Sequence, residues 1–390
     1  MGNVMSSGAE GDPTPSYAGA DEARQVAYER FIWSEITKRL KFAAEVPGPD
    51  FNPLVATPQE LERFKLPSRP DPNSNPRAFA NWRKAMSPPL VFLERGDATS
   101  LFKVSARSRQ LQFQSSLDAT QAMSNNWSGA YIRDNEGETY TRIQGSWVVP
   151  RPYPPPPQTP GGDWLPGTSV ATVWLGLDGC DPGSIAMPQF GTFQKVVVNT
   201  PTRNPADLVT SVYAWWQWWQ IDDDGVQVGI PTSVFPLQVG DLVYAELDVI
   251  DPHTVRFFLK NLSLGTVFPP FDLDQPSPSP TNPNFPVTVE GRTAEWIVER
   301  QTEAHTTNLR PFCDYGAVMF YGCNAQVHTA TGASEDRQLD LATTIRLADW
   351  TLATAGGVDQ PGIHKPGIIV SSAALQGDDG LLVTYTGATP

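Results

Sequence analysis

Two glutamates stand four positions apart in the segment Ala-Glu-Trp-Ile-Val-Glu, residues 294–299. Alternate residues of a β-strand share one face, so a strand here would place Glu295, Ile297 and Glu299 on the same face. Each step along that face is roughly 7 Å, and two carboxylates at such spacings mildly disfavour each other's ionisation. Partial burial would raise at least one pKa further, which makes the pair a candidate acid or base. The alternative is an exposed strand edge with two solvated glutamates.

An unusually aromatic segment, Tyr-Ala-Trp-Trp-Gln-Trp-Trp-Gln, covers residues 213–220. As a strand it would place Trp215, Gln217 and Trp219 on one face, as a flat apolar surface with an amide that suits a peptide or a sugar. The alternative is core packing of the aromatic side chains on both faces. A third segment, residues 174–179, runs from Trp174 to a turn at Asp178, where aspartate is more typical of a turn former than of a catalyst.

The sequence gives little sign of other catalytic or cofactor-binding motifs. The sequence lacks the nucleophile-elbow, phosphate-loop and dinucleotide-binding glycine motifs. Its four histidines are scattered, and its three cysteines, Cys180, Cys313 and Cys323, lack metal-site or redox spacing. We therefore expect neither a metal nor a cofactor. A net charge of -14 also argues against a nucleic-acid partner, because phosphate binding needs a basic face.

The chain divides into two parts with different charge. Residues 1–120 have a net charge of +1 and residues 121–390 one of -15. In the first part we expect a polar tail, an amphipathic helix over about residues 21–44, a short helix opened by the capping box at residues 57–60, and another beginning at residues 75–76. We therefore predict a helical and irregular N-terminal extension over residues 1–120.

Short strands bounded by Gly, Pro, Asn and Asp follow, which is the pattern of an all-β sandwich or barrel. Apolar alternation in residues 243–249 and 255–259 predicts a hairpin that turns at residues 251–253. The proline-dense stretches 151–162 and 269–286 are predicted to be long surface loops. No apolar run is long enough to span a bilayer, and no signal peptide precedes the first part, so the compartment stays open.

Taken together, seven segments resemble the glutamic peptidases, the eqolisin or peptidase A4 family of acid-active endopeptidases. They occur in the family's order over about residues 124–388, and Gln189 stands where the family has a catalytic glutamine. The segments are 126–130, 140–150, 174–179, 189–191, 213–219, 260–265 and 294–299.

The resemblance implies an antiparallel β-sandwich related to the concanavalin A-like jelly roll, with the catalytic pair on a concave sheet face. It makes Glu299 the general base that activates water, and Gln189 the residue that holds this water and then stabilises the oxyanion. It implies hydrolysis of polypeptides with an acidic optimum, without metal or covalent intermediate. Substrate contacts are expected from six residues: Trp174, Asp178, Trp215, Gln217, Trp219 and Glu295.

Three features depart from the family pattern. Gln217 replaces a glutamate, which removes a charge near the catalytic glutamine. Pro188 precedes Gln189 and restricts its backbone. Cys180 has no partner for the family's usual disulfide, and pairing of Cys313 with Cys323 is not expected.

Two questions stay open at this stage. A catalytically silent, lectin-like sandwich that binds peptide or glycan through its aromatic strand is the alternative to a peptidase. Residues 1–120 would be either a prosegment that inhibits the sandwich domain of residues 121–390 or a stable appendage that is never cleaved. Family resemblance suggests secretion, but the missing signal peptide does not support it.

Overall fold

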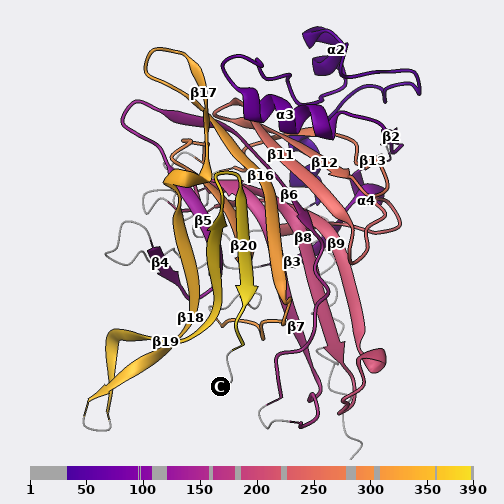
Figure 1. Cartoon of the computed structure of the whole chain (residues 1–390). Coiled ribbons are helices and arrows are strands. Elements are labelled where there is room, and N and C mark those ends of the chain that lie inside the picture. The colour runs from indigo at the N-terminus through magenta and orange to yellow at the C-terminus, as the bar shows by residue number, and fades with distance from the viewer. Residues whose placement is uncertain are drawn as a thin grey trace, which may run out of the picture. The chain divides into compact units, whose positions relative to one another are not determined.

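Period-two alternation dominates the chain and produces a mostly antiparallel β structure in the computed structural model (Figure 1). The structure describes residues 33–387 apart from 95, 97, 108–120, 158–160, 181–185, 221–225, 278–286, 303–307 and 356–357. Arg39–Pro390 form one compact unit, and Met1–Lys38 form a second. The strands are β1 (Leu40–Phe42), β2 (Val91–Phe92), β3 (Lys103–Arg107), β4 (Gln121–Ser124), β5 (Trp127–Arg133), β6 (Thr139–Val148), β7 (Gly167–Leu177), β8 (Ala186–Val198), β9 (Val209–Gln220), β10 (Val226–Ile230), β11 (Leu242–Asp251), β12 (Thr254–Asn261), β13 (Thr266–Val267), β14 (Phe271–Asp274), β15 (Thr293–Glu299), β16 (Ala317–His328), β17 (Ser334–Arg337), β18 (Thr343–Ala355), β19 (Val358–Gln376) and β20 (Gly380–Tyr385).

The strands form one long hydrogen-bonded series. Its first half runs β3, β10, β9, β8, β7, β15, β5 and β18. Its second half continues through β19, β20, β16, β6, β11, β12, β14 and β1. Three short branches extend this series. β4 pairs with β18, and β17 pairs with β16. In the third branch, β13 pairs with β12 and β2 pairs with β13.

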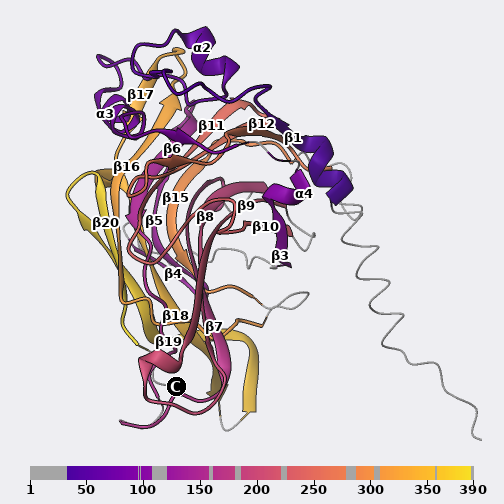
Figure 2. The same cartoon turned by 90° about the vertical axis from the view of Figure 1, so that its right-hand side faces the viewer.

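The two halves pack face to face as the layers of a sandwich (Figure 2). Phe190 of β8 meets Phe257 of β12 with ring centroids 5.4 Å apart. The indole N–H of Trp296 on β15 donates to the main-chain oxygen of Gln144 on β6 at 3.0 Å. These side chains are fully buried, and their burial from water supplies the main stabilisation of the fold. The predicted β-sandwich is therefore confirmed.

The predicted hairpin forms as β11 and β12. Val249 pairs with Val255, and the chain reverses after the pair Asp251–Thr254. One side of both strands points into the sandwich. The other side, with Tyr244 and Phe258, faces outward and is covered by the N-terminal extension.

Two of the predicted helices begin where the sequence signals place them. In α2 (Pro58–Arg63), the Thr57 side chain accepts from the Glu60 main-chain N–H, and the Glu60 carboxylate accepts from the Thr57 main-chain N–H. This is the reciprocal pair of a capping box. Proline stands at the first turn of α3 (Pro76–Ala85), which buries Trp82. A further short helix, α4 (Ala98–Leu101), and two 3₁₀ turns (Pro205–Asp207 and Leu339–Leu341) are also present in the described part.

The expected helix over residues 21–44 is wrong at its C-terminal end. Helix covers residues 33–39 in the described part, and residues 21–32 lie outside it. Leu40 begins β1 instead, because Leu40–Phe42 pairs with the strand β14. Long-range pairing overrides the local helical pattern there.

The stretch 269–286 is also not a continuous loop. Phe271–Asp274 forms β14, and Phe271 and Leu273 are fully buried. The prolines at 269 and 270 directly precede the strand, where no ladder hydrogen bond is lost. Residues 278–286 lie outside the described part.

The N-terminal extension is more than helical and irregular, because β1, β2 and β3 join the sheets. Helices α2 and α3 lie over the outer side of β11 and β12 (Figures 1 and 2). The domain boundary expected at residue 120 stays a prediction.

The three cysteines are buried and free, as expected. None of the described helices is long and apolar enough to cross a membrane.

Candidate active site

The strand that carries both candidate carboxylates is internal to the sheet. β15 pairs with β5 on one side and with β7 on the other, and all seven of its residues are buried. Glu295 is 0% and Glu299 6% exposed. An exposed strand edge with solvated glutamates is therefore wrong, and the two carboxyl groups lie in a poorly hydrated place on one face of β15.

Hydrogen-bond donors from the neighbouring strand β7 surround Glu299. Its Oε2 accepts from the indole N–H of Trp174 at 2.8 Å and from the hydroxyl of Thr172 at 3.4 Å. Burial raises the pKa of Glu299 to about 7, and hydrogen bonds from Trp174, Trp127 and Thr172 act in the opposite direction. A carboxyl group with this pKa can take up and release a proton near neutral pH.

Glu295 has different surroundings although it shares the face. Its Oε1 accepts from the Cys180 main-chain N–H at 3.0 Å and from the Thr293 hydroxyl. Its Oε2 has no hydrogen-bond partner among the described residues. Burial raises the pKa of Glu295 to about 8, and the nearby charge of Asp178 adds to the rise. Glu295 is therefore mainly protonated at neutral pH.

Gln189 lies on β8, paired with Gly176 of β7 and Gln217 of β9. Its amide N–H donates to Oε1 of Gln217 at 3.1 Å. The two side chains are 1% and 2% exposed, and within the described structure Gln189 Oε1 and Gln217 Nε2 have no partner. Pro188 is part of the same strand, opposite Trp218. The pair leaves one acceptor and several amide hydrogens free for other groups.

The strand register places Gln189 and Glu299 on the same face but not side by side. Gln189, Gly176 and Glu295 occupy one row across the strands, whereas Glu299 lies four residues further along β15, opposite Thr172. Among the hydrogen bonds of the described residues, none joins Gln189 to Glu299.

Trp174 lies between the two candidate catalytic residues. Its indole N–H reaches Glu299, and its six-membered ring extends toward Gly176, the neighbour of Gln189. A Cβ atom at Gly176 would lie 3.0 Å from Cζ3 of Trp174 and 3.3 Å from Cβ of Gln189. The indole therefore extends from Glu299 to the space above Gly176, beside which Gln189 lies, and glycine at 176 makes room for it.

The aromatic strand β9 is buried on both faces. Trp216 packs against Phe102, Phe257 and Phe271, while Trp215 and Trp219 join the apolar cluster on the side of Trp174. This is the arrangement that core packing predicts. The indole N–H groups of Trp215 and Trp219 have no hydrogen-bond partner in the described part of the chain. Their contact with a substrate stays a prediction.

Asp178 has a turn-forming role in the structure. It has a positive φ of 72°, and its carboxylate accepts three main-chain N–H bonds, from Glu290, Gly291 and Arg292. Burial raises its pKa to about 6, while these three bonds lower it. Asp178 thus fixes the segment that leads into β15, and its expected substrate contact stays a prediction.

Sequence reasoning missed Thr172 and Trp127, which lie beside Glu299. Thr172 is two residues before Trp174 on β7 and so shares its face, a signal that the sequence contains. Trp127 comes from β5, which pairs directly with β15, so that Trp127 stands opposite Glu299. That neighbour depends on the pairing of strands far apart in the chain.

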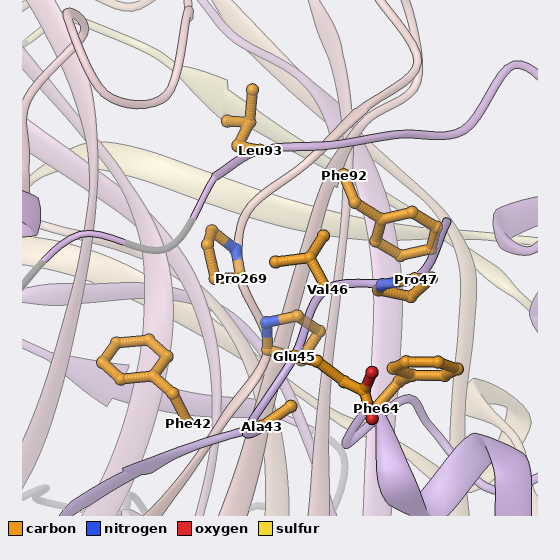
Figure 3. Close-up of a pocket in the computed structure, with 10 residues that line it drawn as sticks. Phe42, Ala43, Glu45, Val46, Pro47, Phe64, Phe92, Leu93 and Pro269 are labelled. Carbon is orange, nitrogen blue, oxygen red and sulfur yellow. The ribbon is translucent and has the colours of Figure 1, made fainter. Parts of the chain in front are cut away.

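Pockets elsewhere in the molecule have different linings. Figure 3 shows a small apolar pocket, lined by side chains of the extension together with Pro269 and Pro270. None of the expected site residues lines it. Among the described residues, no group of three His, Cys, Asp or Glu side chains is placed to hold a metal ion.

Comparison with known proteins gives the family. The family model described as "Peptidase A4 family" matches residues 125–356. No curated protein matches the chain. Among solved structures, scytalido-glutamic peptidase with a transition state analog inhibitor is 18% identical, with a TM-score of 0.43, and the match covers 67% of this chain and 98% of that one.

Two further structures are similar at comparable levels. SCP-B, an eqolisin in complex with the tripeptide Ala-Ile-His, is 17% identical with a TM-score of 0.39, over 67% of this chain and 98% of that chain. Aspergilloglutamic peptidase from Aspergillus niger is 21% identical with a TM-score of 0.35, over 56% and 99%. Since the family model matches more than half of the residues, the chain belongs to the peptidase A4 family, the glutamic-type endopeptidases.

Proposed function

We propose that the chain hydrolyses peptide bonds with Glu299 and Gln189 as its catalytic pair. The supporting observation is the buried Glu299 carboxyl, held by Trp174, on the same sheet face as a Gln189 amide with a free oxygen. Trp174 fixes the orientation of the carboxyl group, while the absence of bulk water strengthens its interactions with reacting groups.

The proposed reaction uses one water molecule and one proton-transfer group. Ionised Glu299 takes a proton from water, and the resulting hydroxide adds to the carbonyl carbon of the peptide bond. The free N–H of Gln189 stabilises the oxyanion that forms. Glu299 then returns the proton to the nitrogen as the C–N bond breaks, which releases an amine and a carboxylic acid. No metal and no covalent intermediate take part.

Two arguments about the pH optimum of the proposed reaction disagree. The family resemblance implies an acidic optimum, and the strongly acidic composition is in line with it. A general base with a pKa near 7 works best when it is ionised, which favours higher pH. Activity in acid therefore stays a prediction that only a pH profile tests.

One observation favours the alternative of a silent binding module. Gln189 and Glu299 are not joined by a hydrogen bond, and the Trp174 indole lies between their rows. A water shared by the pair needs hydrogen-bond reach from both side chains. A binding module would use Trp215 and Trp219 to contact peptide or glycan without cleaving it.

Inhibition of the sandwich domain by residues 1–120 is a further expectation. The packing of residues 39–107 supports the alternative, a stable appendage that is never cleaved. This segment contributes strands to both halves of the strand series, as β1 on β14 and β3 on β10. A segment built into the sheets in this way suits a retained part of the fold better than a removable prosegment.

Cleavage of a denatured protein substrate by the full chain decides between peptidase and binding module. The assay compares wild type with Gln189→Ala across acidic and neutral pH and identifies the products by mass spectrometry. Internal cleavage products from wild type, lost in the variant, would support the proposal. Binding of the substrate without cleavage at every pH would instead establish the binding module.

A further inference from the structure

The residue next to the candidate catalytic glutamine is itself a glutamine. Gln217 is directly opposite Gln189 in the β8–β9 ladder, and both are buried. Where this chain has Gln217, the family resemblance leads one to expect a glutamate. The two amides form one hydrogen bond, from Gln189 Nε2 to Gln217 Oε1 at 3.1 Å.

This bond ties the Gln189 side chain to Gln217. A glutamine side chain has one oxygen acceptor and two N–H donors. One Gln189 N–H is used by Gln217, which leaves the other N–H and Oε1, and Oε1 is buried without a partner in the described structure. Half a turn of the Gln189 amide alone would place two acceptor oxygens against each other, so this amide can reverse only if Gln217 turns with it and donates from its own N–H.

We propose that Gln217 is a positioning residue that holds the Gln189 side chain in place, so that the polar groups of Gln189 left free by this bond serve the attacking water and the oxyanion. This inference rests on the proposed function. Gln217 performs the role without an ionisable group, so the orientation of Gln189 does not change with pH.

Unlike Gln217, several other groups on this sheet face are ionisable. Strand alternation and register place Glu295 and Glu299 of β15, Lys195 of β8 and Arg133 of β5 on the same face. Asp178 lies just past the end of β7. The described residues of β9 and β10 add no titratable side chain to this face apart from Tyr213. A glutamate at position 217 would place a carboxyl group directly beside Gln189.

Two variants of the full chain separate the parts of this proposal. Gln217→Met keeps a similar volume and removes the acceptor, while Gln217→Glu keeps an acceptor and adds an ionisable group. Misplacement of a reacting group costs about 100-fold in rate. We expect Gln217→Met to lose about this factor in kcat with little change in KM, and Gln217→Glu to restore kcat at its own optimal pH.

A purely structural role of Gln217 would leave the pH profile unchanged, so the profile is a separate test of the positioning role. In Gln217→Glu, the carboxyl group beside Gln189 only accepts when ionised but can also donate when protonated, so the pH profile of kcat gains an ionisation that wild type lacks. This measurement also keeps the proposal testable if Gln217→Met fails to fold, which its melting temperature would reveal.

The outcomes distinguish this proposal from the proposed function. Full activity of Gln217→Met, or a kcat profile of Gln217→Glu without an added ionisation, would overturn the positioning role while inactivity of Gln189→Ala still supports the catalytic pair. Full activity of Gln189→Ala would overturn both.

Discussion

Glu299 and Glu295 lie on the same face of one strand, but their neighbours give them different properties. In the described structure, Glu299 accepts hydrogen bonds from two side chains of β7, the indole of Trp174 and the hydroxyl of Thr172. Glu295 also accepts a main-chain N–H bond from Cys180, which ties it to the turn after β7. Glu299 therefore combines a raised pKa with donors that are side chains of the site face, which suits a general base, whereas Glu295 is tied to the main chain of the turn.

The raised pKa of Glu299 has a kinetic consequence. If ionised Glu299 is the base, kcat/KM of the full chain falls about tenfold for each pH unit below about 7, because that is the pKa to which burial raises this group. The measurement is kcat/KM against pH with a peptide substrate of fixed charge. A rate that stays constant well below this pH would mean that ionised Glu299 does not limit the reaction.

The raised pKa of Glu295 has a consequence for stability. This carboxyl group titrates near its ordinary value of 4.5 in the unfolded chain and near about 8 in the folded chain. Between these values the folded state binds more protons, so the free energy of unfolding falls as pH rises through this window. We expect Glu295→Gln to reduce that slope by up to about 1.4 kcal/mol per pH unit.

Urea unfolding at several pH values measures the effect. The matched control is Glu136→Gln, the same substitution at an exposed glutamate between β5 and β6. Equal slopes in wild type and Glu295→Gln would show that Glu295 is ionised in the folded protein.

At the scale of elements, the ladder of β7 and β8 makes room for Trp174. Gly191 of β8 is paired with Trp174, and a Cβ atom there would lie 2.1 Å from the Val173 main-chain oxygen and 2.6 Å from Cβ of Trp174. The two strands can keep this register only with glycine at 191. Trp174 is thereby held where its N–H reaches Glu299.

Gly191→Ala should therefore destabilise the chain and displace Trp174. Overpacking of a buried site costs about 1–3 kcal/mol, and activity should fall along with stability because Glu299 loses its donor. Gly167→Ala at the start of β7 is the control, since no atom lies within 4 Å of the added Cβ. Equal unfolding free energies for the two variants would contradict the tight contact.

The residues that share one face of a strand at the site could be predicted from the sequence. The contacts between residues of different strands could not. Strand alternation alone places Glu295 with Glu299, and Trp215 with Gln217 and Trp219. The bond between Gln189 and Gln217, and the contact of Trp174 with Glu299, depend on the register between strands. Register is set by long-range burial and turn geometry, which a local pattern does not contain.

For the whole molecule, the N-terminal extension is bound to the sandwich through buried cations. Lys260 of β12 is 2% exposed, and its ammonium donates to the main-chain oxygens of Ala85 and Ser87, both at 2.8 Å. Burial lowers the pKa of Lys260 to about 8. Arg256 donates to Asp272 of β14 and to Glu62 of α2. Without residues 39–107, Lys260 would lose these two acceptors, and an unpaired buried cation is costly.

Trp82 tests how far this extension stabilises the fold. It is 1% exposed in the apolar cluster with Tyr244 and Phe258, and its N–H donates to the Pro67 main-chain oxygen at 3.0 Å. Trp82→Ala should lower the free energy of unfolding by about 3–5 kcal/mol. Lys84→Ala, an exposed position on the same helix, should change it by less than about 0.5 kcal/mol.

Urea unfolding followed by tryptophan fluorescence provides the comparison. A wild-type transition in Trp82→Ala would mean that the extension contributes little stability and would favour a removable prosegment. The extension's helices could be predicted from capping signals, whereas its strands could not. β1 has three residues and pairs with a strand more than 200 positions away, as in Leu40 with Leu273, so no local pattern marks it.

The central claim is that Glu299 is the catalytic base, and one comparison of kcat/KM tests it most directly. Glu299→Gln keeps the shape and removes the base. Glu246→Gln makes the same change at another fully buried glutamate, on β11 of the opposite layer, whose pKa burial also raises to about 7. The account predicts that Glu299→Gln abolishes cleavage while Glu246→Gln, once shown to be folded, cleaves at a rate near that of wild type. Cleavage by Glu299→Gln at the wild-type rate would contradict the account.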